Sequence, residues 1–121
     1  MIFGYPCRWL AETESTNDIA RDWALDGAPE GTVVVAGRQT QGRGRRARIW
    51  ESPPGTGLYA SFVLRPDWPA QQAPGLAILG GMAAFHALEL AGVKNLRVKW
   101  PNDVVANGRK ICGVLTEPRL G

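Results

Sequence analysis

The sequence predicts an α+β domain in which helices cover one face of a mixed, mostly antiparallel β-sheet. Two helical segments alternate with short segments rich in valine and other apolar residues that have strand character. Their order along the chain is strand, helix, several strands, helix and strand hairpin. This order is typical of helices packed on one side of a sheet. The chain has 121 residues, a length that fits one domain.

The amino-terminal elements follow from local signals. We expect a first strand over residues 7–11 and a helix opened by Ser15, whose hydroxyl can cap free backbone amides. Gly27 and Pro29 end this helix, and the valine-rich segment 32–36 is a buried strand. The apolar residues Ile19, Ala20, Trp23 and Ala24 share one face of the helix.

The middle of the chain contains a long loop and an apolar helix. Residues 37–57 lack a helical or strand period and carry recurrent glycine and proline, and a loop of that length is usually functional or disordered. A strand over residues 58–64 follows, and then a helix over about 74–91, ended by Gly92. Its apolar run is shorter than the roughly 20 residues of a membrane span. We therefore expect a buried core helix and no membrane partner.

The last elements are strands over residues 96–100, 104–106 and 110–116, with Asn107 and Gly108 as a strong hairpin turn. Pro101 would break a ladder, so the chain must bend there and expose Asn102 and Asp103. The hairpin returns Lys110 to the neighbourhood of Asp103. A lysine and an aspartate held together can bind phosphate, orient a metal ion or form a solvated ion pair.

The basic residues are unevenly distributed, although the net charge is only +3. Five of the 14 basic residues lie within 11 positions, at Arg38, Arg43, Arg45, Arg46 and Arg48. Groove recognition of nucleic acid usually needs a basic helix or a whole basic face, so we expect no nucleic-acid partner. Guanidinium groups between glycines suit a loop that closes over a nucleotide phosphate. An exposed basic loop without a ligand is the simpler alternative.

Two other kinds of site are weakly supported. Gly42, Gly44 and Ala47 match the spacing of a dinucleotide fingerprint, but Pro53 and Pro54 follow too soon for the helix that this fingerprint needs. The only two cysteines lie far apart in the sequence and lack Cys or His neighbours at metal-ligand spacing. This arrangement disfavours a zinc site and a disulfide framework, so we expect both thiols to be free.

The ordered motifs resemble the catalytic domain of the biotin protein ligase family. These motifs are Ser15-Thr16-Asn17, the GRGRR loop, Trp-Glu-Ser-Pro-Pro-Gly from Trp50, Lys-Trp-Pro-Asn-Asp from Lys99, and Lys-Ile-Cys-Gly-Val-Leu from Lys110. The resemblance covers nearly the whole chain. It implies the class II synthetase-like biotin/lipoate ligase fold.

The resemblance also implies roles for individual residues. The positions that match biotin-binding residues are Ser15, Thr16, Asn17, Gln39, Gly42 and Gly113. The positions that match ATP- or adenylate-binding residues are Arg43, Arg45, Arg46, Arg48, Trp50, Asn102 and Lys110. Lys110, Arg45 and Asp103 are the implied catalytic residues, and no protein residue is assigned as a metal ligand. The arginine loop and Lys110 are expected to converge on one adenylate.

The implied reaction uses ATP, biotin and Mg²⁺ to form biotinyl-5'-AMP, and then transfers biotin to a lysine of a biotin carboxyl carrier protein. Its first step brings two anions together, so cations at Lys110 and Arg45 would lower the barrier. Asp103 is placed to orient or deprotonate the acceptor lysine. Alternatives of the same fold are a lipoate or octanoate ligase and a non-catalytic fragment that binds biotin or adenylate.

The chain also departs from the family pattern. Ala47 stands where the family more often has glycine, which stiffens the loop. The sequence ends before the family's further carboxy-terminal strands and small barrel and begins at the first catalytic strand, so we expect these parts and a helix-turn-helix region to be absent. We therefore expect a truncated catalytic domain of the non-regulatory type, with a cytoplasmic location. An exposed sheet edge after Thr116 would suit a homodimer.

Overall fold

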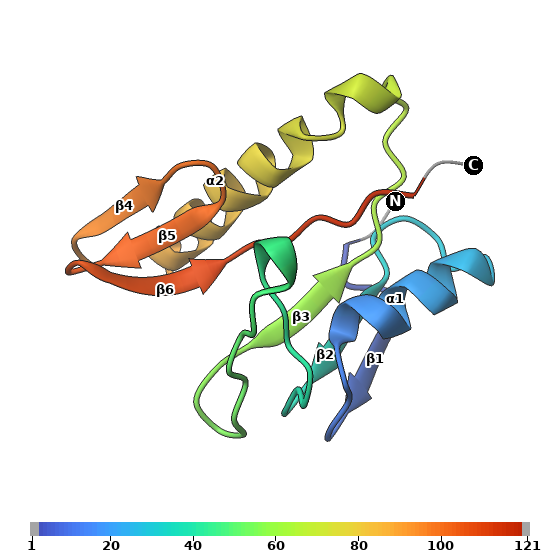
Figure 1. Ribbon diagram of the computed structural model, residues 1–121, viewed down its shortest axis with the longest axis horizontal. Coiled ribbons are helices and arrows are strands. Elements are labelled where there is room, and N and C mark those ends of the chain that lie inside the picture. The colour runs from blue at the N-terminus through green and yellow to red at the C-terminus, as the bar shows by residue number, and fades with distance from the viewer. Residues whose placement is uncertain (1–2, 120–121) are drawn as a thin grey trace. The chain divides into compact units, whose positions relative to one another are not determined.

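The computed structural model describes residues 3–119 and divides the chain into two compact units, Met1–Pro66 and Asp67–Gly121. The α+β class predicted from the sequence is confirmed (Figure 1). The prediction of one sheet is wrong, because the strands form two separate three-stranded sheets. Each unit is described by itself.

The first unit contains one parallel and one antiparallel strand pair. Strands β1 (Cys7–Leu10) and β2 (Val33–Ala36) run parallel, and β3 (Tyr59–Phe62) pairs antiparallel with β2. Helix α1 (Thr16–Leu25) packs on β2 and β3. The buried core consists of Ala20, Val34 and Val63, with Leu10, Ile19, Trp23 and Ala24 packed against it. The predicted apolar face of this helix is thus confirmed.

Helix α1 has the predicted cap. Ser15 is extended and its Oγ accepts a hydrogen bond from the backbone amide of Asn17 at 3.2 Å. At the other end Gly27 has a φ of +100°, a left-handed conformation that glycine adopts without steric cost. The start of the helix therefore fixes the positions of Thr16 and Asn17.

The second unit is an antiparallel sheet with one long helix. It contains the short 3-10 turn η2 (Ala70–Gln72), α2 (Gly75–Leu90), β4 (Leu96–Lys99), β5 (Asp103–Ala106) and β6 (Arg109–Gly113). The strand order is β4-β5-β6, and α2 contacts β4 and β5 (Figure 1). The helix also approaches the connection between β4 and β5 closely, because a Cβ on Gly81 would lie 3.2 Å from the Cα of Asn102.

Helix α2 is not the buried core helix that the sequence predicted. Of its residues only Gly81 is buried, whereas Leu79 is 49% and Met82 is 57% exposed. A three-stranded sheet covers only one side of a helix, and this accounts for the exposure of the other side of α2. With η2 the helical segment Ala70–Leu90 has 21 residues, enough by length and composition alone to cross a membrane, so the prediction that it is too short is also corrected.

The hairpin between β5 and β6 forms as predicted. Asn107 and Gly108 have φ angles of 52° and 78°, as a two-residue turn with left-handed residues requires. Val105 lies opposite Lys110, and a bulge follows between Val104 and Val105. Pro101 does not interrupt a strand, because β4 ends at Lys99 and β5 begins at Asp103.

Candidate functional site

A network of buried and partly buried polar side chains lies at the start of α1 in the first unit. We call the five residues Thr16, Asn17, Gln39, Ser52 and Ser61 the polar cluster. The Oε1 of Gln39 accepts two hydrogen bonds from Thr16, from its backbone amide at 2.8 Å and from its hydroxyl at 3.1 Å. The hydroxyls of Thr16 and Ser61 lie 2.7 Å apart, and Ser61 also donates to Asn17. On the other side, Gln39 donates to Ser52 at 3.1 Å.

Three elements hold the polar cluster in place. Thr16 and Asn17 occupy the first turn of α1, and Ser61 lies within β3. Gln39 follows β2 and is held by isolated bridges to Thr13 on one side and Ser52 on the other. Thr16, Ser52 and Ser61 are 3%, 4% and 7% exposed. Polar groups buried to this extent must be paired to avoid a desolvation penalty, and their mutual hydrogen bonds fix the geometry of the cluster.

Gly42 borders the polar cluster, and its position excludes any side chain. A Cβ at this residue would lie 2.5 Å from the carbonyl oxygen of Trp50 and 2.6 Å from the Oγ of Ser52. It would also lie 3.0 Å from the Nε2 of Gln39. Gly44 is different, because a Cβ there would find its nearest atom at 3.9 Å. The first of the two glycines is therefore required by close packing against the cluster.

The predicted arginine loop forms a small hairpin whose arms join at Gly42 and Trp50. The amide of Trp50 donates to the Gly42 carbonyl at 2.8 Å, and the amide of Gly44 donates to the Arg48 carbonyl at 2.7 Å. At its tip, the 3-10 turn η1 (Arg45–Ala47) includes two left-handed residues, Arg46 at φ 60° and Ala47 at φ 58°. The fingerprint interpretation is excluded, because three residues of 3-10 turn stand where an α-helix would have to begin.

The arginines of this loop fall into two groups. Arg45, Arg46 and Arg48 are exposed at the tip. Arg43 is half-buried at the base, and its Nη2 donates to Asp18 Oδ1 at 2.8 Å. Asp18 lies in the first turn of α1, where a carboxylate also suits the helix dipole. Arg43 therefore ties the base of the loop to α1, while the three tip arginines extend into solvent.

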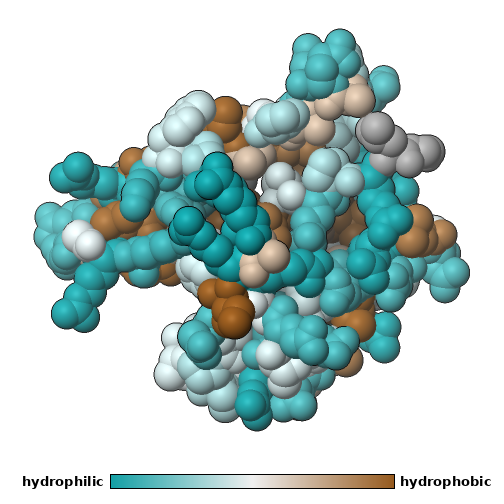
Figure 2. Space-filling view, viewed as in Figure 1, coloured by the Kyte–Doolittle hydropathy of each residue, from teal (hydrophilic) through white to brown (hydrophobic). Residues whose placement is uncertain are grey.

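In the second unit, charged residues share the face of the sheet that is turned away from α2. We call Arg97, Lys99, Asp103 and Lys110 the charged face. Lys110 Nζ lies 3.1 Å from Asp103 Oδ2, with side chains 45% and 15% exposed. Lys99 is the cross-strand neighbour of Asp103 on β4. Figure 2 shows hydrophilic side chains gathered over this sheet on the side in view. The predicted meeting of Lys110 and Asp103 is confirmed.

Three further residues lie where β5 begins and β6 ends, namely Asn102, Cys112 and Gly113. Asn102 is 3% exposed; its side-chain amide donates to the Val114 carbonyl, while its buried Oδ1 has no partner. Burial raises the pKa of the Cys112 thiol; Asp103 raises this pKa further and Lys110 lowers it. Gly113 ends β6 opposite Asp103. Asn102 thus has a structural task, and the expectation that the bend at Pro101 would expose it is wrong.

The structure brings together most of the predicted residues, but in two groups. Ser15, Thr16, Asn17, Gln39, Gly42, Trp50 and the arginines belong to the first unit; Asn102, Asp103, Lys110 and Gly113 belong to the second. Sequence reasoning missed Ser52 and Ser61, which complete the polar cluster. Within residues 3–119 no group of three or more His, Cys, Asp or Glu residues could hold a metal ion.

Comparison with known proteins gives consistent matches. The family described as the biotin/lipoate A/B protein ligase family matches residues 9–121. A bifunctional ligase/repressor BirA of Bacillus spizizenii is 47% identical over 103 residues, which are 85% of this chain and 32% of that protein. A biotin--[acetyl-CoA-carboxylase] ligase of Paracoccus denitrificans is 42% identical over 89% of this chain and 45% of its own length.

A solved structure agrees with the fold. The biotin protein ligase from Aquifex aeolicus in complex with biotin and ATP superimposes with a TM-score of 0.82 at 38% identity. The match covers 94% of this chain and 47% of that chain. The present chain thus spans between a third and a half of the length of these proteins.

Proposed function

We propose, from the premise that this chain belongs to the biotin/lipoate A/B protein ligase family, that it is part of an ATP-dependent biotin ligase. The reaction would join biotin to AMP and then transfer biotin to a lysine of a carboxyl carrier protein. A relative named biotin--[acetyl-CoA-carboxylase] ligase, 42% identical to this chain, supports biotin over other acids.

One observation carries the assignment of substrate, namely the buried polar cluster beside Gly42. The fused ring of biotin is neutral and has both N–H donors and a carbonyl acceptor. Thr16 and Gln39, fixed by hydrogen bonds of 2.8 and 3.1 Å, offer both donor and acceptor atoms without charge. A rigid neutral site discriminates through hydrogen bonds that a wrong ligand would leave unpaired. The close approach at Gly42 adds backbone to the same surface.

The first chemical step needs cations more than it needs a protein nucleophile. A carboxylate oxygen of biotin forms a bond to the α-phosphorus of ATP, and the bond from that phosphorus to the bridging oxygen of pyrophosphate breaks. Both reactants are anions, so placed positive charge lowers the barrier. We assign this task to Lys110 of the second unit; for Arg45, which is exposed at the loop tip of the first unit, the role of a second cation rests on the family resemblance alone.

A magnesium ion would reach this site with its nucleotide. The described residues offer Asp103 but no cluster of three acidic or histidine ligands. Mg²⁺ commonly keeps several waters and binds through substrate phosphates plus one or two carboxylates. We therefore treat Mg²⁺ as part of the substrate MgATP. Asp103 would contribute at most one protein oxygen to it.

The second step requires a neutral acceptor lysine. Asp103 is the only acidic residue of the charged face, and its carboxylate is mostly buried beside Lys110. A carboxylate in that position can orient an incoming ammonium group and accept a hydrogen bond as the proton leaves. Relatives that act on acetyl-CoA carboxylase support a carrier protein as the acceptor. This role for Asp103 is part of the proposal.

Biotin-dependent exchange of labelled pyrophosphate into ATP tests the assignment. We expect exchange with biotin and at least about a hundredfold less with lipoate, because a site built on hydrogen bonds rejects a ligand that lacks them. Calorimetry with biotin in the absence of ATP gives an independent reading of the polar cluster. Equal exchange with lipoate would replace the biotin assignment by a lipoate ligase, and binding of biotin without exchange would indicate a non-catalytic fragment.

A further inference from the structure

Ser52 is a buried hydroxyl that connects the polar cluster to the second arm of the arginine loop. It is 4% exposed, follows Trp50 by two residues and is bridged to Gln39 through the backbone. Its Oγ lies 3.1 Å from the Nε2 of Gln39 and 3.0 Å from the carbonyl oxygen of Trp50. Gln39 is assigned to biotin and Trp50 to the adenylate, so one hydroxyl joins a residue of each group.

The directions of these hydrogen bonds follow from groups that can only donate or only accept. The backbone amide of Thr16 can only donate, so the atom of Gln39 that lies 2.8 Å from it must be the oxygen. The Nε2 of Gln39 therefore faces Ser52. The Trp50 carbonyl can only accept, so the Ser52 hydroxyl donates its proton there and accepts from Gln39. With its amide turned over, Gln39 would face a hydroxyl whose proton is already donated.

The backbone at Ser52 is fixed independently of its hydroxyl. The Ser52 carbonyl accepts a hydrogen bond from the backbone amide of Gln39 at 3.2 Å. At the next residue, the carbonyl of Pro53 accepts a hydrogen bond from the hydroxyl of Tyr59 at 2.8 Å, and Tyr59 is buried on β3. Removal of the Ser52 hydroxyl should therefore leave the path of the chain in place, so that its effect reports on Gln39 and Trp50.

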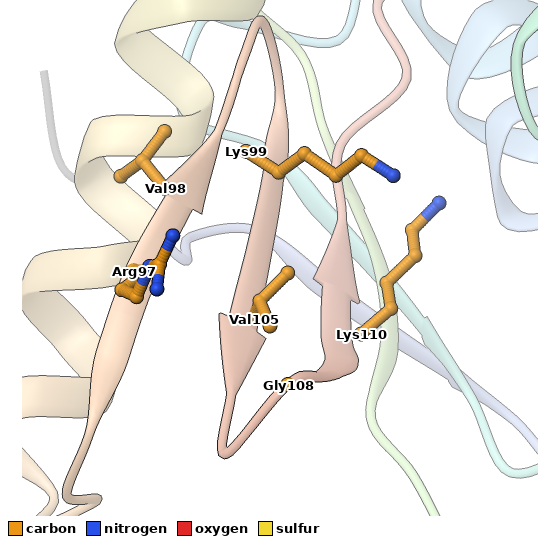
Figure 3. A pocket seen from close by; sticks show the side chains of 6 residues that line it. All are labelled: Arg97, Val98, Lys99, Val105, Gly108 and Lys110. Atoms are coloured by element: carbon orange, nitrogen blue, oxygen red, sulfur yellow. The ribbon is translucent and has the colours of Figure 1, made fainter.

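Side chains on the charged face are held less firmly than Ser52. Lys99 and Lys110 are exposed and extend toward one another beside a pocket (Figure 3). This pocket is lined by Arg97, Val98, Lys99, Val105, Gly108 and Lys110. An exposed lysine retains many rotamers, whereas a buried hydroxyl with two partners has one geometry. Positioning by a fixed hydrogen bond is therefore a property of the polar cluster.

We propose that Ser52 is a positioning residue for both groups of site residues in the first unit. It holds the Gln39 amide in the orientation that meets biotin, and it holds the Trp50 end of the arginine loop against the polar cluster. It acts through these two neighbours and not by contact with a substrate. The inference rests on the proposed function and extends it to a residue to which the motifs assign no role.

Calorimetry with biotin tests the link to Gln39 through a double-mutant cycle. Ser52→Ala removes one hydrogen bond from the Gln39 amide, so the dissociation constant for biotin should rise about fivefold. In a Gln39→Met background the same substitution should change this constant by less than about twofold, because the group through which Ser52 acts is gone. The cycle measured by thermal unfolding needs no ligand and should be non-additive in the same way. Equal effects of Ser52→Ala in the two backgrounds overturn the proposal.

Hydrogen exchange tests the link to Trp50, also without a ligand. The Trp50 amide donates to the Gly42 carbonyl at 2.8 Å, and we expect Ser52→Ala to speed its exchange with solvent about fivefold. Thr56→Ala is the matched control, because it removes another hydroxyl of this loop, which is exposed and donates to the Pro53 carbonyl at 3.4 Å. There, exchange at Trp50 and biotin affinity should stay within about twofold of the original values. Unchanged exchange in Ser52→Ala overturns the proposal, and so does an equal acceleration in Thr56→Ala.

Ser52→Cys is the second variant if thermal unfolding shows that Ser52→Ala is not folded. It keeps a side chain of similar shape but replaces the hydroxyl by a thiol that forms only weak hydrogen bonds, so the same changes in biotin affinity and in exchange at Trp50 are expected. Absence of biotin binding to the unaltered protein would refute the proposed function. Exchange at Trp50 and the unfolding cycle would still decide whether Ser52 holds its two neighbours.

Discussion

The polar side chains of the two units differ in charge, burial and pairing. In the first unit, the polar cluster is neutral, mostly buried and held in place by mutual hydrogen bonds, as between Thr16 and Gln39. In the second, the charged face is open, and Arg97 and Lys99 have no ion pair among the described residues. Buried neutral groups select by geometry, whereas exposed cations act over longer range and depend on salt. The first arrangement suits recognition of a neutral ring, and the second suits handling of phosphates.

The largest effect is expected on the charged face, from Lys110→Ala. Removal of the cation that we assign to the α-phosphate should lower the rate of adenylate formation by about 10²–10³. Biotin binding should change little, because the polar cluster belongs to the first unit. Rapid-quench measurement of adenylate and calorimetry with biotin separate the two effects. Arg109→Ala removes the adjacent cation outside the pocket and serves as the control; an equal rate loss there would mean that net charge alone matters.

The second prediction concerns Gly42→Ala in the first unit. We expect this substitution to lower the stability of the fold moderately and to weaken biotin binding. The new methyl group would meet the Trp50 carbonyl at 2.5 Å, so the loop must shift at a cost of about 1–3 kcal/mol. Gly44→Ala, with no atom closer than 3.9 Å, is the matched control. Thermal unfolding and biotin calorimetry measure both variants. Comparable biotin affinity in the two variants would show that Gly42 does not border the site.

The smallest effect is expected from Ala47→Gly at the tip of the arginine loop. Ala47 has a φ of 58°, and a left-handed alanine costs roughly 1 kcal/mol more than glycine. The substitution should stabilise the hairpin, so that the amide of Gly44, bonded to Arg48 at 2.7 Å, exchanges with solvent about fivefold more slowly. Faster or unchanged exchange would show that the tip is not under strain.

The loop tip also shows how far the sequence predicted the site. The motif resemblance placed the arginines and noted Ala47 as a departure, but only the backbone angles connect that departure to a strained conformation. Likewise Arg43 was grouped with the phosphate-binding arginines, and its ion pair with Asp18 became visible only from their separation of 2.8 Å. Contacts between residues 25 positions apart have no local sequence signal.

Local elements were predicted well for physical reasons that act within a few residues. The Ser15 cap, the apolar face around Ala20 and the Asn107-Gly108 turn depend only on neighbours in the chain. The division into two sheets depends on which strands pair at long range, and periodicity does not encode that. Ser52 and Ser61 were missed for the same reason, since a single serine in a strand or loop gives no pattern. The exposure of α2 depends on how much sheet is available to cover it.

The separate tasks of the two units can be measured directly by NMR titration of the backbone amides with biotin and with inorganic pyrophosphate. We expect biotin to shift the resonances of Thr16, Gln39 and Ser61, and pyrophosphate to shift those of Lys99, Val105 and Lys110. If biotin instead shifts the charged face, or pyrophosphate the polar cluster, the assignment of biotin recognition to the polar cluster and of phosphate handling to the charged face is wrong.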